Sequence, residues 1–367
     1  MEKVITVQTE SSRYPVFVGN NSLCKINEIL HSINPTTICI VTDETVKALH
    51  LNTVLDVLSD KFSYHIFTTP IGEKAKSFDV YQQLVDFAAT KGLDRKSIFI
   101  ALGGGAIGDL TGFAAATYMR GVEFIQVPTT ILAHDSSVGG KTGINLQAGK
   151  NLIGAFHHPA AVIYHLPFLN TLPDNEKRSG FAEIIKESMI HPQSFLNELM
   201  NQFQTVSDLH GEEFFKPLIQ GLETKKIYVE QDEKEMGVRA YLNLGHTLGH
   251  AIEANVGYGK ITHGEAVFIG LIFALKLSEK VFLKDLQISN FINWAKKLEY
   301  TTYLPQDLSF TKLLNTMKRD KKTVSGQIRF VLLNGYGKPV LKEISDDTIL
   351  ATLKEWKNEI AEEGSFI

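Results

Sequence analysis

The sequence has little of several features that mark particular classes of protein. Its 367 residues include only two cysteines, Cys24 and Cys39, which form no CxxC pair. A chain of this length needs no disulfide staples, so we expect a reducing, cytoplasmic setting. A basic excess is also missing, since the formal net charge is -4, and nucleic acids and anionic membranes usually require a basic surface. We therefore expect no nucleic-acid or membrane partner.

Long apolar segments are missing as well. The longest run, Ala266–Leu275, is about half the length of a membrane-spanning helix, and it predicts a buried helix instead. The first residues, Met1–Val4, contain no basic region followed by an apolar stretch, so no signal peptide is expected. Hydrophobic residues make up 44% of the chain and charged residues 21%, as in ordinary globular proteins. The length predicts about two domains.

The first half of the sequence alternates strand-like and helix-like patterns. Strands are predicted over the apolar or β-branched runs Thr37–Asp43, Tyr64–Phe67, Ser97–Leu102 and Phe124–Val127. Ser77 is suited to cap a helix whose apolar residues run from Phe78 to Ala88 and which ends near Gly92. Strands that alternate with helices predict a parallel sheet covered by helices on both faces.

After about Pro173 helical periodicity dominates. Helices are predicted over Phe181–Ile190, Phe195–Phe203, Phe215–Val229, His246–Val256 and Gly264–Val281, and a late strand over Ile328–Leu333. The fold class predicted is an α/β N-terminal domain with a Rossmann-like parallel sheet, followed by a mainly α-helical C-terminal domain. The change of pattern alone places the boundary, which gives domains over residues 1–170 and 171–367.

A glycine-rich segment, Gly103–Gly108, matches the pattern G-x-G-x-x-G. It directly follows an apolar strand and opens a predicted helix over Ala106–Tyr118, where glycines allow a pyrophosphate to approach the helix N-terminus. The alternative is a tight turn that binds nothing. The acidic residue expected about 20 positions further on, at the end of the next strand, is missing, because Glu123 lies at the start of that strand. Asp43, which ends an earlier strand, is the better candidate for contacting a ribose hydroxyl.

Histidines and a carboxylate suggest a metal site in the second half. His246 and His250 are four residues apart on a predicted helix and so share a face. His263 follows, and Glu183 shares a face of another helix with Lys186. One carboxylate with imidazoles is a normal ligand set for catalytic zinc. Spacing alone favours His246 and His250 as co-ligands, and the alternative is that these are ordinary hydrogen-bonded histidines.

Cationic residues gather beside small polar ones. The segments Asp135–Gly143 and Gly149–Asn151 are rich in glycine and carry lysines, but they lack the P-loop pattern. Further cations in the second half are Lys225, Arg239, Lys321 and Lys322. Each one alone is typical of a solvated surface. As a group they suit an anionic substrate, which needs several charged donors.

Four motifs in order give the chain a recognisable resemblance. They are Gly103–Leu110 (GGGAIGDL), Asp135–Gly143 (DSSVGGKTG), Gly180–Lys186 (GFAEIIK) and Leu242–Glu253 (LNLGHTLGHAIE). Together they resemble the 3-dehydroquinate synthase family of sugar-phosphate cyclases, over nearly the whole chain. The resemblance implies conversion of 3-deoxy-D-arabino-heptulosonate 7-phosphate into 3-dehydroquinate and phosphate, in the shikimate pathway of aromatic amino-acid biosynthesis. It also implies an NAD cofactor, a Zn²⁺ or Co²⁺ ion and a homodimer.

The reaction implied by the resemblance is a phosphate-eliminating lyase reaction in several steps. NAD transiently oxidises a ring alcohol, phosphate is eliminated, and the hydride returns. Ring opening and an intramolecular aldol closure complete the turnover. Correct placement within one molecule is worth about 7–11 kcal/mol of the barrier, so we expect the site to be closed and poor in water.

The resemblance also assigns residues. It places the metal on Glu183, His246 and His263 and moves His250 to the substrate. The implied NAD contacts are Asp43, Glu73, Lys76, Gly104, Gly105, Ala106, Ile107, Gly108, Asp109, Thr129, Thr130, Lys141, Lys150, Phe168, Leu169, Asn170 and Thr171. The implied catalytic and substrate residues are Arg120, Asp135, Lys141, Asn151, Lys186, Lys225, Arg239, Asn243, His250 and one of Lys321 and Lys322. Arg120 is expected to reach the site of a neighbouring subunit.

Three rival interpretations stay open on the sequence. Another sugar-phosphate cyclase would share the cofactor, metal and fold, although Asn243 and His250 favour the dehydroquinate enzyme. A metal-dependent polyol or alcohol dehydrogenase would release NADH instead of recycling it. A nucleotide-binding sensor with an inactive site would lack some of the ligands, whereas this sequence has all of them.

Overall fold

The computed structural model describes the chain except for residues 147–148, 193, 258, 306–307, 320–326 and 365–367. The chain divides into two compact units. Unit 1 comprises Met1–Pro173 and His210–Lys234, and unit 2 comprises Asp174–Leu209 and Glu235–Ile367. The chain therefore passes from one unit to the other after Pro173, Leu209 and Lys234, whereas the change of sequence pattern predicts a single boundary near residue 170.

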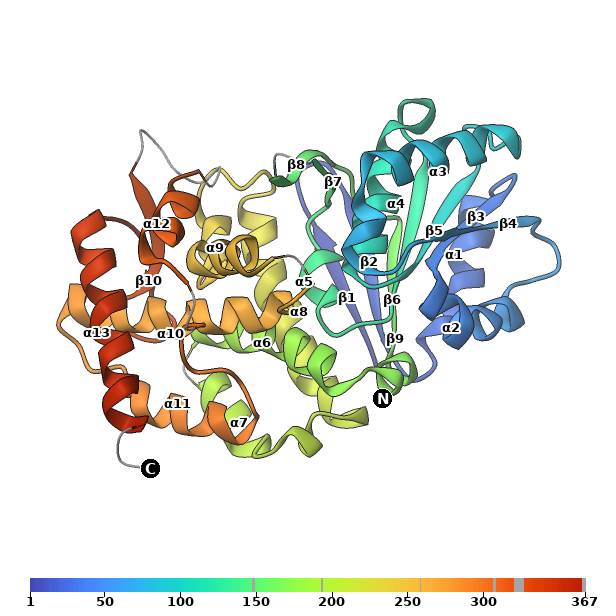
Figure 1. Cartoon of the computed structure of the whole chain (residues 1–367). Coiled ribbons are helices and arrows are strands. Elements are labelled where there is room, and N and C mark those ends of the chain that lie inside the picture. Colours follow the sequence, from blue (N-terminus) through green and yellow to red (C-terminus); the bar gives the residue numbers. More distant parts are fainter. Residues whose placement is uncertain (147–148, 193, 258, 306–307, 320–326, 365–367) are drawn as a thin grey trace. The chain divides into compact units, whose positions relative to one another are not determined.

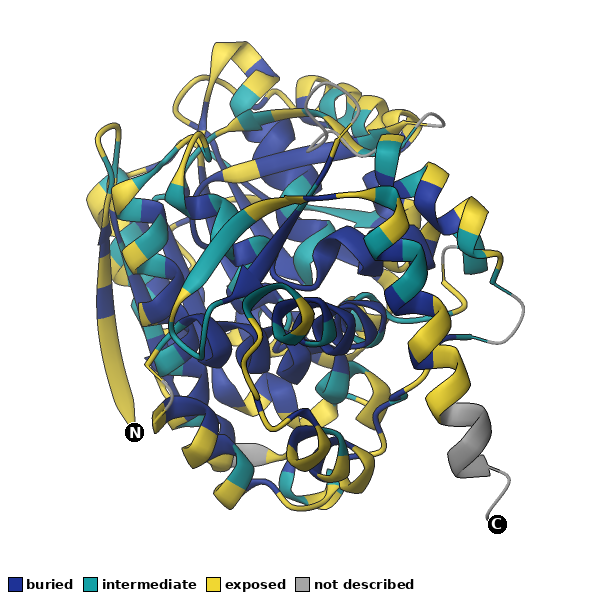
Figure 2. Ribbon diagram, turned by 90° about the vertical axis from the view of Figure 1, so that its left-hand side faces the viewer, coloured by how far each residue is buried: buried dark blue, intermediate teal, exposed yellow. Residues whose placement is uncertain are grey.

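Unit 1 is built on a seven-stranded sheet with the order β1-β2-β9-β6-β5-β3-β4 (Figure 1). The neighbouring strands β2, β9, β6, β5, β3 and β4 are parallel to one another. Strand β1 pairs antiparallel with β2 and forms the outer strand on that side. Figure 2 shows the N-terminal strand β1 as mostly exposed. The strands are β1 (Glu2–Gln8), β2 (Arg13–Gly19), β3 (Ile38–Asp43), β4 (Tyr64–Thr69), β5 (Ile98–Gly103), β6 (Glu123–Pro128) and β9 (Ala161–His165).

Helices cover both faces of this sheet, because its central strands are apolar on both sides. On β3, Ile38 and Ile40 pack with helices α1 (Lys25–Ile33) and α2 (Glu44–Val57). The alternate residues Cys39 and Val41 pack with α3 (Phe78–Thr90) and α4 (Gly105–Thr117). The side chains of a strand alternate between its two faces, so one apolar run builds two core layers. The predicted α/β sheet wound on both sides is confirmed.

Two local features of unit 1 are a helix cap and a hairpin. Ser77 caps α3 by accepting the Val80 N–H at 3.2 Å. The lysine-bearing, glycine-rich segment forms an antiparallel hairpin of β7 (Lys141–Leu146) and β8 (Gly149–Phe156), which the sequence analysis does not anticipate. Unit 1 also contains α5 (Ala133–Ser136), α8 (Phe215–Gln231) and the 3-10 helices η1 (Ser22–Cys24), η2 (Gly72–Lys76), η3 (Tyr118–Arg120), η4 (Leu166–Thr171) and η6 (Gly211–Phe214).

Unit 2 is mainly helical around one apolar helix, α10 (His263–Phe282). The run Ala266–Leu275 lies within α10 and is buried throughout, and α10 packs against α6, α9, α13 and strand β10. The other elements are α6 (Asp174–Ile190), α7 (Ser194–Gln202), α9 (His246–Val256), α11 (Ile288–Lys297), α12 (Phe310–Arg319), α13 (Asp346–Gly364), η5 (Val206–Asp208), η7 (Val238–Asn243) and the hairpin β10 (Ile328–Leu333) with β11 (Pro339–Ile344). The predicted helical second half is confirmed.

Neither Cys24 nor Cys39 is in a disulfide. Within the described part of the chain, no helix combines the length and the apolar character that crossing a bilayer requires.

Candidate functional site

The glycine-rich turn joins β5 to α4 at the carboxyl edge of the sheet. Gly104 is the N-cap of α4, and no side chain caps this end of the helix in the described structure. A Cβ atom on Gly105 would lie 2.9 Å from Ser136 Oγ, so the turn packs closely on the neighbouring segment. Main-chain N–H groups and the positive end of the helix dipole suit a phosphate. This turn, which includes Ala106, Ile107 and Gly108, meets the requirements of a pyrophosphate site.

The other predicted NAD contacts follow the same edge of the sheet. Asp43 ends β3, and Thr129 and Thr130 follow β6. Residues Glu73 and Lys76 lie in η2 after β4, and Phe168, Leu169, Asn170 and Thr171 lie in η4 after β9. The carboxyl ends of parallel strands meet at one edge, which is where open α/β sheets bind ligands. Asp43 has a structural task as well, because its Oδ1 caps α2 by accepting the N–H groups of Thr45 and Val46, each at 2.9 Å.

Lys76 connects three of the predicted residues. Its Nζ lies 2.7 Å from Asp109 Oδ2 and 2.6 Å from Asn151 Oδ1, and the side chain is buried. Burial raises the pKa of Asp109, although the Lys76 ammonium opposes that shift. On the same hairpin, Asn145 donates to Glu73 at 2.7 Å and accepts the Asn151 N–H at 3.0 Å. Lys76 therefore ties η2 to α4 and to β8.

A second ion pair of unit 1 brings together residues far apart in sequence. Lys225 Nζ of α8 lies 3.2 Å from Asp135 Oδ1 of α5. Both were predicted substrate residues. Lys141 begins β7, with its side chain exposed, and Lys150 lies on β8. The hairpin and α8 thus carry three of the predicted cations of unit 1, Lys141, Lys150 and Lys225.

In unit 2 the structure brings Glu183, His246 and His263 together. Glu183 Oε1 lies 3.4 Å from His246 Nε2 and 3.3 Å from His263 Nε2, and Glu183 is fully buried. Ligands that bind a tetrahedral zinc ion at 2.0–2.1 Å are separated from each other by about 3.3 Å. One carboxylate oxygen and two imidazole nitrogens at these separations fit a zinc or cobalt ion.

Close helix packing sets this geometry. Glu183 lies on α6, His246 begins α9, and His263 begins α10. A Cβ atom on Gly264 would lie 1.9 Å from the carbonyl oxygen of Ser179, and one on Gly270 would lie 1.9 Å from that of Gly245. Only glycine at these two positions lets α10 approach α6 and α9 so closely. Each contact is next to, or within one helical turn of, a residue of the trio.

The two histidines differ in charge. Burial lowers the pKa of His246 well below its ordinary value, and Lys186, His250 and His263 add to that shift against the opposing Glu183. Burial also acts to lower the pKa of His263, but Glu183 and Glu253 overcome it and raise the pKa to about 10. In the metal-free protein His246 is therefore neutral, the form that binds metal, whereas His263 carries a proton that a divalent cation would displace.

Four further predicted residues of unit 2 lie near this trio in sequence or in space. Lys186 Nζ pairs with Glu183 Oε2 at 2.6 Å, with both side chains buried. The His250 ring centre lies 5.3 Å from that of His246 and 5.9 Å from that of His263. Arg239 in η7 is buried, and Asn243 in the same element donates to Glu235 at 2.8 Å. The region around the trio is therefore rich in buried charge.

Some predicted residues are not brought to these clusters. Arg120 is exposed at the end of η3, directly after α4, with φ of 70°. It lies at the end of α4 remote from the glycine-rich turn, and α4 has 13 residues, a length of about 20 Å. Lys321 and Lys322 are outside the described residues.

Two residues that sequence reasoning missed contact the predicted ones. His50 of α2 lies 2.9 Å from Thr171 Oγ1, with its ring centre 4.3 Å from that of Phe168. Glu253 of α9 lies 3.2 Å from His263 Nδ1. Glu253 follows His246 by seven residues, or two helical turns, so its place on the same helix face was visible in the sequence.

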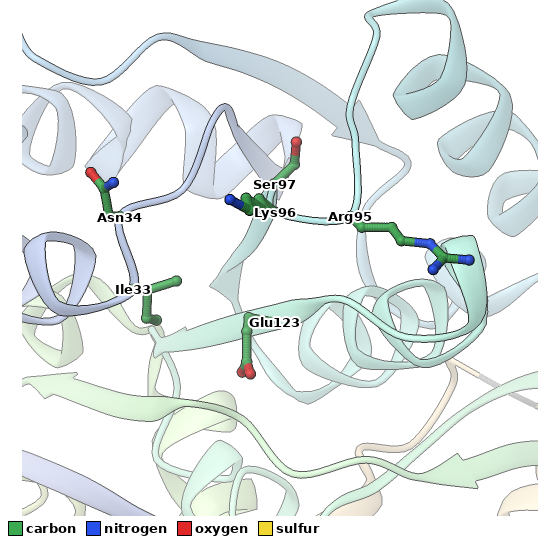
Figure 3. A pocket seen from close by; sticks show the side chains of 6 residues that line it. All are labelled: Ile33, Asn34, Arg95, Lys96, Ser97 and Glu123. Atoms are coloured by element: carbon green, nitrogen blue, oxygen red, sulfur yellow. The ribbon is translucent and has the colours of Figure 1, made fainter.

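A surface hollow of about 440 Å³ lies at the other end of the strands, away from their carboxyl ends. Figure 3 shows the six side chains that line it: Ile33, Asn34, Arg95, Lys96, Ser97 and Glu123. These residues precede β3 and β5 or begin β6, so they mark the amino ends of the strands. This position explains why Glu123, despite its spacing from the glycine-rich turn, is at the wrong edge to replace the missing acidic residue.

Comparisons with known proteins agree with this arrangement. Residues 66–179 match the family model of the 3-dehydroquinate synthase N-terminal part, and residues 180–323 match that of the C-terminal part. The 3-dehydroquinate synthase of Halalkalibacterium halodurans is 51% identical over 346 residues, which cover 94% of this chain and 96% of the relative.

Two solved structures are similar in fold. The 2-deoxy-scyllo-inosose synthase complexed with carbaglucose-6-phosphate, NAD⁺ and Co²⁺ has a TM-score of 0.87 at 23% identity, covering 96% of this chain and all (100%) of that one. The 2-epi-5-epi-valiolone synthase from Streptomyces hygroscopicus with NAD⁺ and Zn²⁺ bound has a TM-score of 0.86 at 23% identity, covering 97% and 99%. At this identity the likeness shows a shared fold.

Proposed function

The chain belongs to the 3-dehydroquinate synthase family, and we propose that it converts 3-deoxy-D-arabino-heptulosonate 7-phosphate into 3-dehydroquinate and phosphate. One observation carries the proposal beyond family membership. A single chain contains both a glycine-rich turn suited to a dinucleotide and a Glu183, His246 and His263 trio spaced for a metal ion. The lyase class, and the requirement for NAD and a metal, follow from the same proposal.

NAD supplies a hydride acceptor that later returns the hydride, and Zn²⁺ or Co²⁺ supplies a Lewis acid for the alcohol being oxidised. We propose that Glu183, His246 and His263 hold the ion. Lys186 pairs with Glu183 through its 2.6 Å contact, and burial favours the neutral form of His246 by lowering its pKa. The side chains of the trio would therefore hold a divalent cation.

The residues proposed for the dinucleotide lie in unit 1. The turn from Gly104 to Gly108 is proposed to bind the pyrophosphate through the N–H groups of its first residues. The N–H groups of Ile107 and Gly108 donate to the Gly104 carbonyl oxygen and shape the turn. Oδ2 of Asp43 is proposed to contact a ribose hydroxyl, because Oδ1 caps α2. Lys76 keeps Asp109 and Asn151 in fixed positions through two short contacts. The other proposed contacts are Glu73, Lys141, Lys150, Thr129, Thr130, Phe168, Leu169, Asn170 and Thr171.

The remaining residues are proposed to bind the substrate. Lys141, Asn151, Arg239 and His250 would position its phosphate, since a dianion needs several charged or polar donors. The phosphate oxygens can then remove the neighbouring proton that elimination requires. Asp135, Lys186, Lys225, Asn243 and one of Lys321 and Lys322 would orient the sugar hydroxyls. Fixed orientation matters most for the final aldol closure, which joins two ends of one molecule.

We also propose that the protein is a cytoplasmic homodimer whose Arg120 completes the partner's site. Two features support this. The cysteines are free, as is usual in a reducing compartment. Arg120 is exposed at the end of α4 remote from the glycine-rich turn, so a role for it in phosphate binding requires a second copy of the chain.

The decisive test is phosphate release from the heptulosonate phosphate, with and without a chelator. The proposal expects phosphate to appear without net NADH, and expects the chelator to abolish its release. Accumulation of NADH would favour a polyol dehydrogenase. Turnover of a different sugar phosphate, with none of the heptulosonate phosphate, would identify another cyclase. Activity that persists without any metal would contradict the proposed site.

A further inference from the structure

In the two histidines of the trio, different groups contact the ring nitrogen Nδ1. His246 Nδ1 lies 3.2 Å from the carbonyl oxygen of Leu244, and His263 Nδ1 lies 3.2 Å from Glu253 Oε2. In both rings the other nitrogen, Nε2, is then the one next to Glu183. The same orientation is thus obtained once from the main chain and once from a buried side chain.

We infer that Glu253 is a positioning residue of the metal site, which accepts the Nδ1–H of His263 and thereby presents its Nε2 to the ion. This inference rests on the proposed metal site. A neutral imidazole has one N–H and one lone pair, so an acceptor at Nδ1 selects the tautomer whose Nε2 can bind metal. Carboxylates next to metal-bound histidines also make the ring a stronger ligand.

The surroundings of the two rings explain why His263 needs such a partner more than His246 does. The His246 side chain is 9% exposed and that of His263 is 30% exposed. Both histidines are the first residue of their helix, so it is the exposure of the side chain that distinguishes them. The Glu253 side chain, 6% exposed, reaches His263 from α9. Helix α9 therefore supplies one proposed ligand and the group that orients a ligand on α10.

A second interpretation of the same residues is possible. His250, Glu253 and His263 also have ligand atoms within 4.8 Å of one another, which would make Glu253 a ligand of a separate ion. That ion would share His263 with the first ligand set. It would also add two positive charges beside Lys186 and the first ion. The geometry therefore favours one ion, and a measurement of how many ions the chain binds decides between the two interpretations of Glu253.

The test measures metal binding directly. The full-length protein is stripped with a chelator and titrated with Zn²⁺ and Co²⁺ against a chromogenic competitor. Glu253→Gln keeps an acceptor oxygen but loses the charge, and Glu253→Leu loses both. We expect affinity to fall about 10-fold for the first and about 100-fold for the second, the range found for orienting residues. The visible absorption of bound Co²⁺ should shift in both variants.

Glu265→Gln is the matched control. Glu265 lies two residues after His263 on α10 and pairs with Arg178 Nη2 at 3.7 Å. Removing this charge should change metal affinity by no more than about 2-fold. Equal weakening by Glu265→Gln and Glu253→Gln would show that net charge rather than the contact to His263 matters, and would overturn the inference. Wild-type affinity in Glu253→Gln would overturn it too.

The number of ions separates the remaining outcomes. One ion per chain in wild type and in Glu253→Gln, bound more weakly in the variant, supports the inference. Two ions in wild type and one in the variant would make Glu253 a ligand instead. No ion in wild type would refute the proposed metal site itself. Thermal unfolding of the metal-free proteins checks folding, and if Glu253→Leu does not fold, the Gln variant carries the test.

Discussion

The two clusters of proposed site residues are assembled by different means. In unit 1 most of the proposed dinucleotide contacts follow the carboxyl ends of separate parallel strands, and sheet topology brings those ends together. In unit 2 the three proposed metal ligands lie on three helices, whose close approach depends on glycines that meet neighbouring main-chain atoms. A cluster on loops at a sheet edge should tolerate local change. A cluster set by direct contact between helix backbones should not.

Removing a ligand from the helical cluster should give the largest effect. In His246→Ala the trio keeps one carboxylate and one imidazole, so we expect the metal to be lost and activity to fall at least about 1000-fold, or about 4 kcal/mol in transition-state stabilisation. NAD affinity, measured by fluorescence titration, should stay unchanged because its proposed residues lie in unit 1. His191→Ala, a histidine of unit 2 outside both metal-binding groups, is the control. Full activity in metal-free His246→Ala would contradict the assignment.

A methyl group added to a glycine compares the two assemblies directly. In Gly264→Ala the new Cβ would meet the Ser179 carbonyl oxygen at 1.9 Å, so α10 must move, and we expect a loss of about 3 kcal/mol in the free energy of unfolding and weaker metal binding. In Gly105→Ala the new Cβ meets Ser136 Oγ at 2.9 Å, a hydroxyl that can rotate away.

Stability in Gly105→Ala should therefore change by no more than about 1 kcal/mol, partly because alanine favours the helix, although NAD should bind more weakly. Urea unfolding and metal titration of both variants give the answer. Equal destabilisation of the two would show that the helical cluster is no less tolerant than the sheet edge.

The sequence predicts unit 1 better than the helical cluster, because a strand is a local pattern and contacts between helices are not. The strands β3 to β6 are visible as apolar or β-branched runs, and the order of parallel strands then places their ends together. The hairpin that begins at Lys141 was missed, because its glycines and polar residues hide the alternation of a half-buried strand. Helix α8 was predicted as a helix, but periodicity does not say which core a helix joins, and α8 belongs to unit 1.

The helical cluster was less accessible to sequence reasoning. Spacing identifies His246 and His250 as neighbours on one helix, yet the structure places Glu183 and His263 beside His246 as one possible ligand set. Those contacts join residues on three helices, so no local pattern contains them. The resemblance supplied them in the prediction. Glu253 was not predicted, since an acidic residue on a helix is usually a solvated one.

A smaller effect is expected from Arg239, the proposed phosphate ligand on η7. The Arg239→Ala variant should bind phosphate-bearing ligands about 10- to 100-fold more weakly, the range for lost hydrogen bonds to a charged group. NAD affinity should hardly change. The control Arg178→Ala removes another largely buried guanidinium of unit 2, whose partners are Glu265 and Glu299. Calorimetric titration with substrate and with NAD measures both, and equal losses for the two ligands would count against the role.

The smallest expected effect concerns Glu233, whose charged contacts lie in unit 1 and belong to neither cluster of proposed site residues. Burial acts to raise the pKa of Glu233, but hydrogen bonds from Ser11 and His158 outweigh it and lower the pKa to about 2. A lowered pKa stabilises the folded state above the ordinary carboxyl pKa, and this contribution is lost as pH falls from about 4.5 towards 2.

Glu233→Gln should therefore be less stable than wild type by about 1 kcal/mol near neutral pH, and the difference should shrink across that acidic range. Ser11→Ala, which keeps the carboxylate and removes one donor, should show a smaller loss over the same range. Thermal unfolding at a series of pH values tests this. A stability difference for Glu233→Gln that stays constant down to pH values near 2 would mean that packing, not the carboxylate charge, ties the β1–β2 turn to the end of α8.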